Sequence, residues 1–463
     1  MFGRIKKIHF VGLGGIGISG MAELLHSLGY EITGSDLKST EITDHLQQLG
    51  IRFFEGHDGD NVDACDMVVY SSAVRLDNPE LKMARQRNIP VIRRAEMLGE
   101  LLKVADVSIA VAGTHGKTTT SSMIGHMLTA AQRDPTMIIG GIVRSLATNY
   151  RQGRGNLIVV EADEFDRSFL SLFPTIAVIT NIDLEHLDCY RNLEDLTQAF
   201  TQFANAVPFY GRVVACLDCP NMQALLPQLK RPVTTFGLSP QADVQARNLA
   251  GDAMRMSFEV RVPGNEAPVK VNLPVPGEYN VRNALAAIAT CLELQVPLDE
   301  MVAGLQQYTG VNRRFELTET IDDVLFVDDY AHHPREVAAV LAAAREGWER
   351  RVVAVFQPHL YSRTRDFHED FARAFLDSDL LVVTDIYAAR EDPLEGINGE
   401  LIASDAINIG HKQVHYIPQL DDLAGAVAEL VRSGDMVITM GAGDITTYNA
   451  TIRDAYRQCV GKT

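Results

Sequence analysis

Cysteine is scarce in this sequence of 463 residues. The six cysteines present are too few for a disulfide framework in a chain of this length. Cys216 and Cys219 form a single CxxC pair. A structural zinc site needs four ligands, and no second pair of suitable spacing follows. We therefore interpret the pair as two small residues flanking the end of a strand, in a reducing compartment.

Positive charge is also in short supply. The chain has 42 lysines and arginines against 60 aspartates and glutamates, a net charge of -18. A protein that binds nucleic acid needs a basic face for the phosphates, so this composition argues against that class. An anionic ligand must instead be held by local groups, such as glycine-loop amides, helix N-termini and a few arginines.

Long apolar runs, internal repeats and low-complexity tracts are missing. No apolar run is long enough to cross a bilayer, so we expect no membrane insertion. The stretch from Ile8 to Met21 follows basic residues as in a signal peptide, but glycines interrupt it and it has no clear cleavage site. We expect a cytoplasmic protein, and the sequence leaves open whether it is a monomer or a homodimer.

Short apolar runs alternate with segments of helical length along almost the whole chain, which predicts βαβ units and parallel sheets. The length suits roughly three domains. New α/β units open near Val107 and after Arg314, and residues 240–276 are richer in strand signals, proline and glycine. We predict an α/β fold with a Rossmann-like domain at 1–105, a central P-loop ATPase-type parallel sheet with a small β insertion at 106–312, and a Rossmann-like domain at 313–463.

The runs expected to form buried parallel strands are Ile8–Val11, Ile32–Gly34, Met67–Tyr70, Ser108–Ala112, Leu157–Val160, Ile176–Thr180, Val213–Cys216, Val324–Val327, Val352–Phe356, Leu380–Thr384 and Met436–Met440.

A glycine-rich motif follows the first of these runs. It reads Gly12-Leu13-Gly14-Gly15-Ile16-Gly17 and fits G-x-G-x-x-G, in which glycines allow a tight turn and let backbone approach a pyrophosphate. Asp36 ends the second run about 20 residues later, where such folds place a ribose-binding acid. This motif alone predicts nucleotide or dinucleotide binding. An NAD-dependent dehydrogenase and a glycine turn without a ligand are the alternatives.

A second loop gives a stronger indication. The apolar run that ends at Ala112 continues into Gly113-Thr114-His115-Gly116-Lys117-Thr118-Thr119 and then a helical stretch. Backbone amides and the helix dipole cradle phosphates in such a loop, a lysine neutralises the β and γ phosphates, and a hydroxyl binds Mg²⁺. The loop departs from the usual pattern because Val111 stands at the position of its first glycine. We predict an ATP-binding loop.

Two acidic clusters follow neighbouring predicted strands. Glu161, Asp163 and Glu164 come after one run, and the segment from Asn181 to Asp188 comes after the next. Parallel strands present catalytic groups at their carboxyl ends. The clusters therefore predict divalent metal sites beside the phosphate loop, with solvated loop charges as the alternative.

The last third of the chain carries further polar groups at predicted strand ends. Arginines and histidines here are suited to carboxylate or phosphate binding. The adjacent pair His332 and His333 resembles a metal site, but neighbouring loop residues rarely bind one ion together. We predict instead a turn in which Pro334 opens a helix.

Together these motifs resemble those of the Mur ligase family. The matching strings run in family order from residue 9 to about 367, and GAGDI at 441–445 resembles the late glycine turn of the family. The strings are HFVGLGGIGISGMAE, GSD, SSAV, NPE, IPVIRRAEML, AGTHGKTTT, EADE, TNIDLEHLD, PGEYNVRNALAA, GVNRRFE, VDDYAHHPREV and QPHLYSRTRDF.

The resemblance implies a three-domain ligase that uses ATP and Mg²⁺. Its first domain is expected to bind a UDP-sugar rather than NAD, its second ATP, and its third the amino acid. The strings are most similar to those of ligases that join L-alanine to the lactyl carboxylate of UDP-N-acetylmuramate through an acyl phosphate, the first amino-acid addition to peptidoglycan precursors. The alternative within the family is a recycling ligase that adds a tripeptide to the same carboxylate.

Site roles carry over from the resemblance residue by residue. The catalytic residues are expected to be Lys117, Glu161, His186, Arg314 and Asp329, with Thr118, Glu161 and His186 as metal ligands. ATP is expected to bind Gly113, Thr114, His115, Gly116, Lys117, Thr118, Thr119, Asn280 and Asn283. The UDP-sugar is expected to bind Gly12, Gly14, Gly15, Gly17, Asp36, Ser71, Ser72 and Arg93, and the alanine carboxylate His359 and Arg363.

The sequence departs from the family pattern at two positions. Leu360 stands where relatives often have arginine, and Phe165 where many have serine. No lysine occurs between Lys117 and Lys230, which fits a first-step ligase because later-step enzymes use a carbamylated lysine there. The base that takes the proton of the amine stays open among His186, His333, Asp329 and water.

Overall fold

The computed structural model describes residues 2–71, 73–185, 189–389 and 391–461. Within these residues, three β-sheets follow one another along the chain, with five, ten and six strands. This succession of strand–helix units confirms the three-domain α/β class. By contacts the chain divides into two compact units, one of residues 1–247, 259–271 and 282–309 and the other of residues 248–258, 272–281 and 310–463. No helix in the described ranges is long and apolar enough to cross a membrane.

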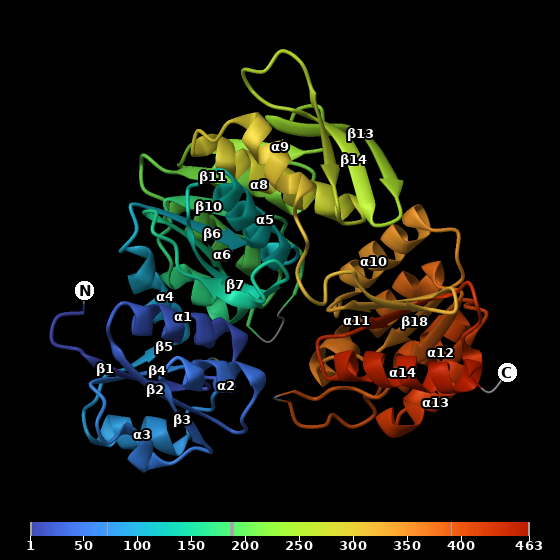
Figure 1. Ribbon diagram of the computed structural model, residues 1–463, viewed down its shortest axis with the longest axis horizontal. Helices are drawn as coiled ribbons and strands as arrows, with labels where there is room; N and C mark the ends of the chain where they lie inside the picture. Colours follow the sequence, from blue (N-terminus) through green and yellow to red (C-terminus); the bar gives the residue numbers. More distant parts are fainter. Residues whose placement is uncertain (1, 72, 186–188, 390, 462–463) are drawn as a thin grey trace. The chain divides into compact units, whose positions relative to one another are not determined.

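The five-stranded sheet has the order β3-β2-β1-β4-β5, and its strands pair in parallel. The strands are β1 (Lys7–Val11), β2 (Glu31–Asp36), β3 (Arg52–Glu55), β4 (Met67–Tyr70) and β5 (Val91–Arg93), connected by α1 (Ile16–Ser27), α2 (Glu41–Gln48), α3 (Pro79–Gln86) and α4 (Arg94–Leu102). The glycine-rich motif joins the central strand β1 to α1, as the sequence predicts (Figure 1).

The ten-stranded sheet has the order β15-β14-β13-β12-β11-β10-β6-β9-β7-β8. Its strands are β6 (Val107–Ala112), β7 (Thr136–Val143), β8 (Thr148–Arg151), β9 (Leu157–Glu161), β10 (Ile176–Ile179), β11 (Arg212–Cys216), β12 (Val233–Gly237), β13 (Val244–Asp252), β14 (Arg255–Arg261) and β15 (Val269–Leu273). The helices are α5 (Lys117–Ala130), α6 (Leu193–Asn205), α7 (Pro220–Leu225), α8 (Glu278–Glu293) and α9 (Leu298–Gln306). The strand-rich segment predicted as an insertion thus continues the central sheet as β13 to β15.

The six-stranded sheet has the order β16-β17-β21-β18-β19-β20, with β16 antiparallel to β17. Its strands are β16 (Glu316–Ile321), β17 (Val324–Asp329), β18 (Val352–Phe356), β19 (Leu380–Val383), β20 (Val414–Tyr416) and β21 (Met436–Met440), and its helices are α10 (Pro334–Gly347), α11 (Tyr361–Ala374), α12 (Glu400–Asn408), α13 (Leu420–Leu430) and α14 (Ile445–Val460).

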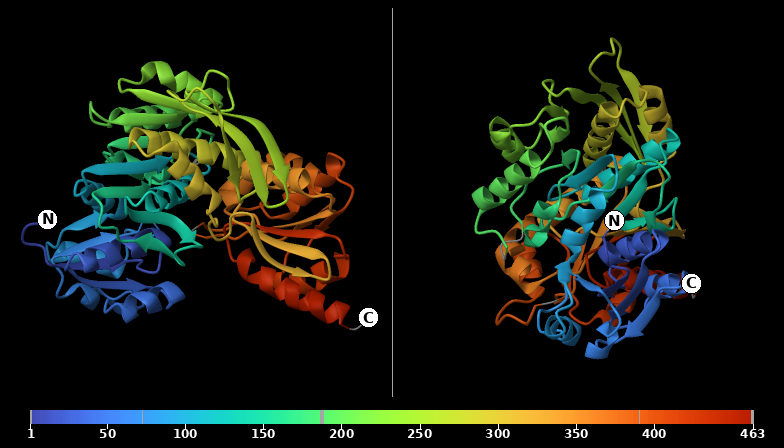
Figure 2. Two further views of the ribbon diagram at one scale, coloured as in Figure 1. Left: turned by 45° about the horizontal axis from the view of Figure 1, so that its top comes forward. Right: turned by 90° about the vertical axis from the view of Figure 1, so that its left-hand side faces the viewer.

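Side chains on β17 alternate between two cores. Leu325 and Val327 pack with α10, α11 and α12 on one face, whereas Val324 and Phe326 pack with α13 and α14 on the other. Helices accordingly cover both faces of this sheet (Figure 2). Burial on both faces explains why strands such as β18 are apolar at every position.

Each apolar run predicted as a buried strand overlaps an observed one, with ends that agree within two residues. The helix predicted to open at Pro334 is α10, and the ring of His333 caps it by accepting a hydrogen bond from the Arg335 amide at 3.3 Å. Cys216 ends β11 and Cys219 precedes α7, so the CxxC pair flanks a strand end as predicted.

A buried carboxylate organises the first sheet. Glu80, at the start of α3, is fully buried and accepts hydrogen bonds from the Ser35 hydroxyl and the Asn61 amide, each at 2.7 Å. The rings of His57 and His9 lie 2.9 and 3.4 Å from the same carboxylate. Burial raises the pKa of Glu80, but the contacts with His9, Ser35 and Asn61 outweigh it, and the pKa lies below its ordinary value.

This carboxylate supports the glycine-rich loop through Ser35. The Ser35 carbonyl accepts hydrogen bonds from the amides of Gly12 and Leu13, both at 2.9 Å. Asp36, the next residue, accepts from the Gly14 amide at 2.8 Å. The end of β2 therefore fixes the loop, and Glu80 fixes the end of β2.

Replacing Glu80 by glutamine should lower the free energy of unfolding at pH 7 by about 2–4 kcal/mol, because a buried charged network loses its only anion. The folded-state pKa of Glu80 is depressed, so its stabilisation is present above the ordinary pKa of 4.5 and is lost as the pH falls through the folded value. The difference between wild type and Glu80→Gln in urea unfolding should therefore shrink in acid.

The matched control is Glu31→Gln on β2, where an exposed glutamate pairs with Lys7 at 3.1 Å. This change should alter stability by no more than about 0.5 kcal/mol. Equal stability of the two variants at pH 7 would contradict the role given to Glu80.

Candidate functional site

The phosphate loop lies between β6 and α5, and two of its glycines are sterically required. Gly113 has φ +127° and Gly116 has φ +81°. A Cβ atom on Gly113 would lie 2.1 Å from the Thr180 hydroxyl, and one on Gly116 would lie 2.4 Å from the Asn283 side-chain oxygen. Only glycine satisfies both the left-handed backbone and the close approach.

The neighbouring strand β10 holds the loop in place. The Asn181 side chain accepts from the His115 amide at 2.9 Å and donates to the His115 carbonyl at 3.0 Å. The Thr114 hydroxyl accepts from the Asp183 amide at 2.9 Å. The segment predicted as a second acidic metal cluster therefore braces the loop through Asn181 and Asp183.

Lys117 begins α5 and points back across the loop. Its ammonium donates to the Gly113 carbonyl at 2.7 Å, the Thr114 carbonyl at 3.2 Å and both Glu164 carboxylate oxygens at 2.8 and 3.0 Å. Burial by itself lowers the pKa of Lys117, but the carboxylates of Glu164 and Asp163 reverse this effect and the pKa is raised. The lysine is therefore held as a cation at the loop.

Glu161 and Thr118 form a pair of oxygen groups beside this lysine. The Thr118 hydroxyl donates to one Glu161 carboxylate oxygen at 3.1 Å, and the Gly140 amide donates to the other at 2.9 Å. A carboxylate and a hydroxyl are hard oxygen donors of the kind that Mg²⁺ prefers, so these residues fit the expected ion. His186, the third predicted ligand, lies outside the described residues. Among the residues that are described, no three His, Cys, Asp or Glu side chains cluster as a metal site.

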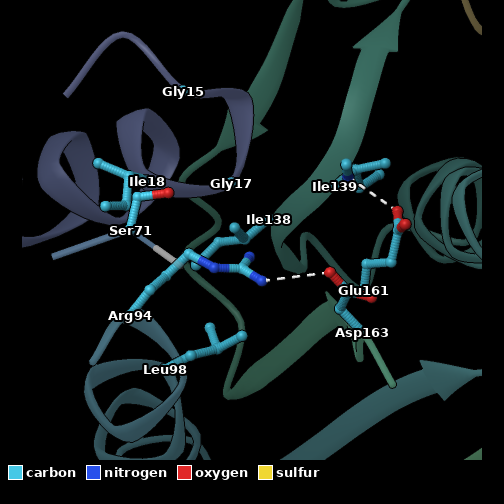
Figure 3. A pocket seen from close by; sticks show the side chains of 11 residues that line it. Gly15, Gly17, Ile18, Ser71, Arg94, Leu98, Ile138, Ile139, Glu161 and Asp163 are labelled. Carbon is cyan, nitrogen blue, oxygen red and sulfur yellow. Dashed lines mark hydrogen bonds and ion pairs between the residues drawn. The ribbon is translucent and has the colours of Figure 1, made fainter. Parts of the chain in front are cut away.

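A cleft of about 230 Å³ joins these acids to the N-terminal glycine loop. Its lining comprises Gly15, Gly17, Ile18, Ser71, Arg94, Leu98, Ile138, Ile139, Gly140, Glu161 and Asp163. Figure 3 shows the Arg94 side chain reaching from α4 toward Asp163, 3.6 Å away, while the Glu161 carboxylate turns toward β7. A Cβ atom on Gly17 would lie 2.5 Å from the Arg94 guanidinium. Arg94 therefore faces the N-terminus of α1, where an anion is favoured.

The other residues predicted for the UDP-sugar lie around this cleft or next to it. Gly12 has φ +86° and packs against Ser71, and Asp36 is engaged with the loop amides. Arg93 donates to Asp166 at 3.0 Å and lines a second cleft of about 240 Å³ with Phe165. Ser72 lies outside the described residues.

The predicted nucleotide residues of α8 have different surroundings. Asn283 accepts a hydrogen bond from the Thr120 hydroxyl at 3.3 Å and lies against Gly116, so it touches the phosphate loop. The Asn280 side chain is buried and donates to the Pro276 carbonyl at 2.7 Å. Thr119, the last predicted loop residue, is buried in the first turn of α5.

The predicted residues of the C-terminal third all belong to the second unit. Asp329 accepts hydrogen bonds from the amides of Phe315 and Ala331 at 2.6 and 2.7 Å. Burial raises the pKa of Asp329 to about 6, against the opposing effect of Arg314. The Arg314 guanidinium lies 5.1 Å from the centre of the Tyr330 ring. Asp329 thus fixes the turn that carries Arg314.

The side chains of His359, just before α11, and Arg363, within α11, lie in contact, with 3.1 Å between their nitrogens. The His359 ring stacks on Tyr387 with 5.8 Å between the ring centres. Leu360, one of the two positions at which the sequence departs from the family pattern, has φ +71°. Its amide donates a hydrogen bond to the Tyr387 carbonyl at 3.0 Å. This hydrogen bond to Tyr387 fixes the backbone at Leu360.

Sequence reasoning missed three groups in this site. Arg94 was overlooked in favour of its neighbour Arg93, although the strand ends at Arg93 and the helix begins at Arg94. The sequence places Glu164 in an acidic cluster but does not predict its contact with Lys117, and nothing in the sequence marks Gly140. The feature that could separate the two arginines is their position, with Arg93 at the end of the strand and Arg94 at the start of the helix.

The first unit thus brings together a glycine loop with a buried lysine, a carboxylate and hydroxyl pair beside it, and a second glycine loop on the same cleft. Models of the Mur ligase family match residues 7–105 (catalytic domain), 111–291 (middle domain) and 313–443 (glutamate ligase domain). The chain belongs to the Mur ligase family.

Known relatives are similar over nearly the whole chain. A UDP-N-acetylmuramate–L-alanine ligase of Geotalea uraniireducens is 49% identical over 98% of each chain. The crystal structure of a UDP-N-acetylmuramate–alanine ligase from Thermotoga maritima matches with a TM-score of 0.82 and 31% identity, covering 98% of this chain and 99% of that one. A murein peptide ligase from Psychrobacter arcticus matches with a TM-score of 0.73 and 24% identity, covering 97% and 98%, which shows a shared fold.

Gly140→Ala should raise the Mg²⁺ concentration needed for half-maximal activity by roughly tenfold or more, as loss of a supporting contact does at other metal sites. The new Cβ would lie 2.5 Å from a Glu161 carboxylate oxygen and would push it away from Thr118. Gly425→Ala is the control, because a Cβ added there would have no atom of another part of the chain within 4 Å. An unchanged Mg²⁺ requirement in Gly140→Ala would show that Glu161 does not hold the ion.

Proposed function

We propose that this chain catalyses the ATP-dependent formation of an amide between L-alanine and the lactyl carboxylate of UDP-N-acetylmuramate, the first amino-acid addition to a peptidoglycan precursor. The observation that carries this proposal is the buried Lys117 of the phosphate loop beside Glu161, in a chain 49% identical to a ligase named for these two substrates. A dehydrogenase would leave Lys117 without a function. The tripeptide-adding ligase has weaker support, because the solved structure named for that reaction is 27% identical and covers 67% of this chain.

The first step is attack of the muramate carboxylate on the γ-phosphorus of ATP. It forms an acyl phosphate and releases ADP. Catalysis of such a step is mainly positioning and neutralisation of charge. Lys117, the loop amides and the N-terminus of α5 are placed to hold the phosphates.

The second step is attack of the neutral alanine amine on the acyl carbon. Phosphate leaves with the bonding electrons, and the proton lost by the amine passes to a base that stays open among His333, Asp329, His186 and water. His359 and Arg363 supply the donors expected for the alanine carboxylate.

Thr118 and Glu161, which lie in contact, would hold Mg²⁺, and the bound ion would neutralise phosphate charge. Arg94 faces the cleft between the glycine loop and Glu161, where it is suited to the anionic part of the UDP-sugar. The domain boundaries near residues 105 and 312, a cytoplasmic location and a monomeric or homodimeric state stay predictions.

The function is tested by phosphate release from the purified chain with ATP, Mg²⁺ and UDP-N-acetylmuramate. The amino component is L-alanine, L-serine, glycine, the tripeptide or none. Release is expected only when both the UDP-sugar and an amino acid are present, and fastest with L-alanine. Serine and glycine should still be used, though more slowly than L-alanine, because one small group changes binding by only about 1–3 kcal/mol. Release with the UDP-sugar and the tripeptide, but with none of the single amino acids, would assign the chain to the recycling ligases.

Lys117→Ala should reduce turnover by at least about 10²–10³-fold, the usual cost of removing one group that stabilises transition-state charge. The circular dichroism spectrum and the melting temperature show whether the fold is intact. Lys103→Ala, at an exposed lysine paired with Glu100, is the control and should keep wild-type turnover. Near-normal turnover in Lys117→Ala would refute the role of the phosphate loop.

A further inference from the structure

The Lys117 ammonium has three protons, and the protein itself provides acceptors for all of them. Two acceptors are neutral carbonyls of the loop, and the other two are the oxygens of the Glu164 carboxylate. The Glu164 side chain is 1% exposed and that of Lys117 is 14% exposed. The cation expected to meet the nucleotide phosphates is therefore already engaged by a buried anion.

The position of Glu164 is fixed by its own segment. Its backbone carbonyl accepts from the Tyr190 hydroxyl at 2.6 Å and from the Arg167 amide at 3.0 Å. Asp163, the preceding residue, accepts from the Phe165 amide at 3.1 Å and, through its carbonyl, from the Ser168 hydroxyl at 2.9 Å. The carboxylate thus faces Lys117 from a braced turn at the end of β9, not from a loose loop.

We propose that Glu164 holds the place of a nucleotide phosphate against Lys117 and that ATP binding exchanges this carboxylate for the β and γ phosphates. Glu164 is then a positioning residue that keeps the lysine in the loop and sets the affinity for polyphosphate. This inference rests on the proposed ATP-dependent function.

The exchange has a physical rationale. A buried ammonium without a counter-ion is costly, so an empty loop needs an internal anion. A carboxylate and a phosphate both accept charge-assisted hydrogen bonds, so one can replace the other without leaving Lys117 uncompensated. The cost falls on the nucleotide, which must displace an existing ion pair. Removing the Glu164 charge should therefore strengthen nucleotide binding, whereas loss of a purely structural brace would weaken it.

The test measures dissociation constants by calorimetry for the full chain with Mg²⁺ and ATP, ADP or AMP, without the UDP-sugar or alanine. In Glu164→Gln, ATP and ADP should bind at least roughly tenfold more tightly, as expected for one hydrogen bond to a charged group. AMP should bind as in wild type, because the loop lysine meets only the β and γ phosphates.

Two further variants separate exchange from bracing. Tyr190→Phe removes the hydroxyl that holds the Glu164 carbonyl but keeps the carboxylate, so it should not tighten ATP binding. Glu164→Asp keeps the charge but withdraws it by one methylene, and it should tighten ATP binding less than Glu164→Gln; it also serves as the test if Glu164→Gln does not fold. ATP binding unchanged or weakened in Glu164→Gln and Glu164→Asp, or equal tightening of AMP, would overturn the exchange.

These outcomes are distinct from failure of the proposed function. A wild-type chain that binds no ATP would refute the proposed function itself. A wild-type chain that binds ATP and ligates alanine, with variants that bind ATP no more tightly, would refute only the exchange.

Discussion

The parallel pairing of β6 with β9 on one side and with β10 on the other determines most of the site. It brings the carboxyl ends of three strands to one edge of the central sheet. The phosphate loop follows β6, Glu161 ends β9, and Asn181 follows β10. Each group then acts on its neighbours: Glu161 accepts from Thr118, and Asn181 holds His115. A shift in this register would separate the lysine, the carboxylate and the loop brace at once.

The central strands and the phosphate loop were predictable from sequence for a physical reason. β6 and β18 are buried along nearly their whole length, so they read as unbroken apolar runs. The edge strands β3 and β20 are half-exposed, and their mixed patterns gave no signal. Local motifs predict Lys117, Thr118 and Glu161 as site residues, and the structure brings Thr118 and Glu161 into contact. The Glu164 contact with Lys117 and the place of Arg94 were not, because they arise from packing between segments far apart in sequence.

The two glycine loops of the first unit are supported in similar ways. In each, backbone groups next to a glycine turn are held by residues at or just after the end of an adjacent strand. The Ser35 carbonyl and the Asp36 carboxylate accept from amides of the first loop. In the second loop, Asn181 accepts from the His115 amide and the Thr180 hydroxyl donates to the His115 carbonyl. The Ser35 hydroxyl in turn depends on the buried Glu80. Polar groups buried beneath the loops, and not only the glycines in them, therefore keep the loop backbone in position.

Leu360 shows how a strained backbone limits which residues a position can accept without loss of stability. Its backbone, with φ +71° and ψ 136°, costs a residue other than glycine roughly 1–3 kcal/mol, a cost that the hydrogen bond from its amide to the Tyr387 carbonyl and the start of α11 help to offset. Glycine would relieve that strain, whereas valine or isoleucine would increase it. The backbone strain is therefore the same for leucine as for the arginine that the family resemblance implies, so leucine stands here without a change in the path of the chain past His359.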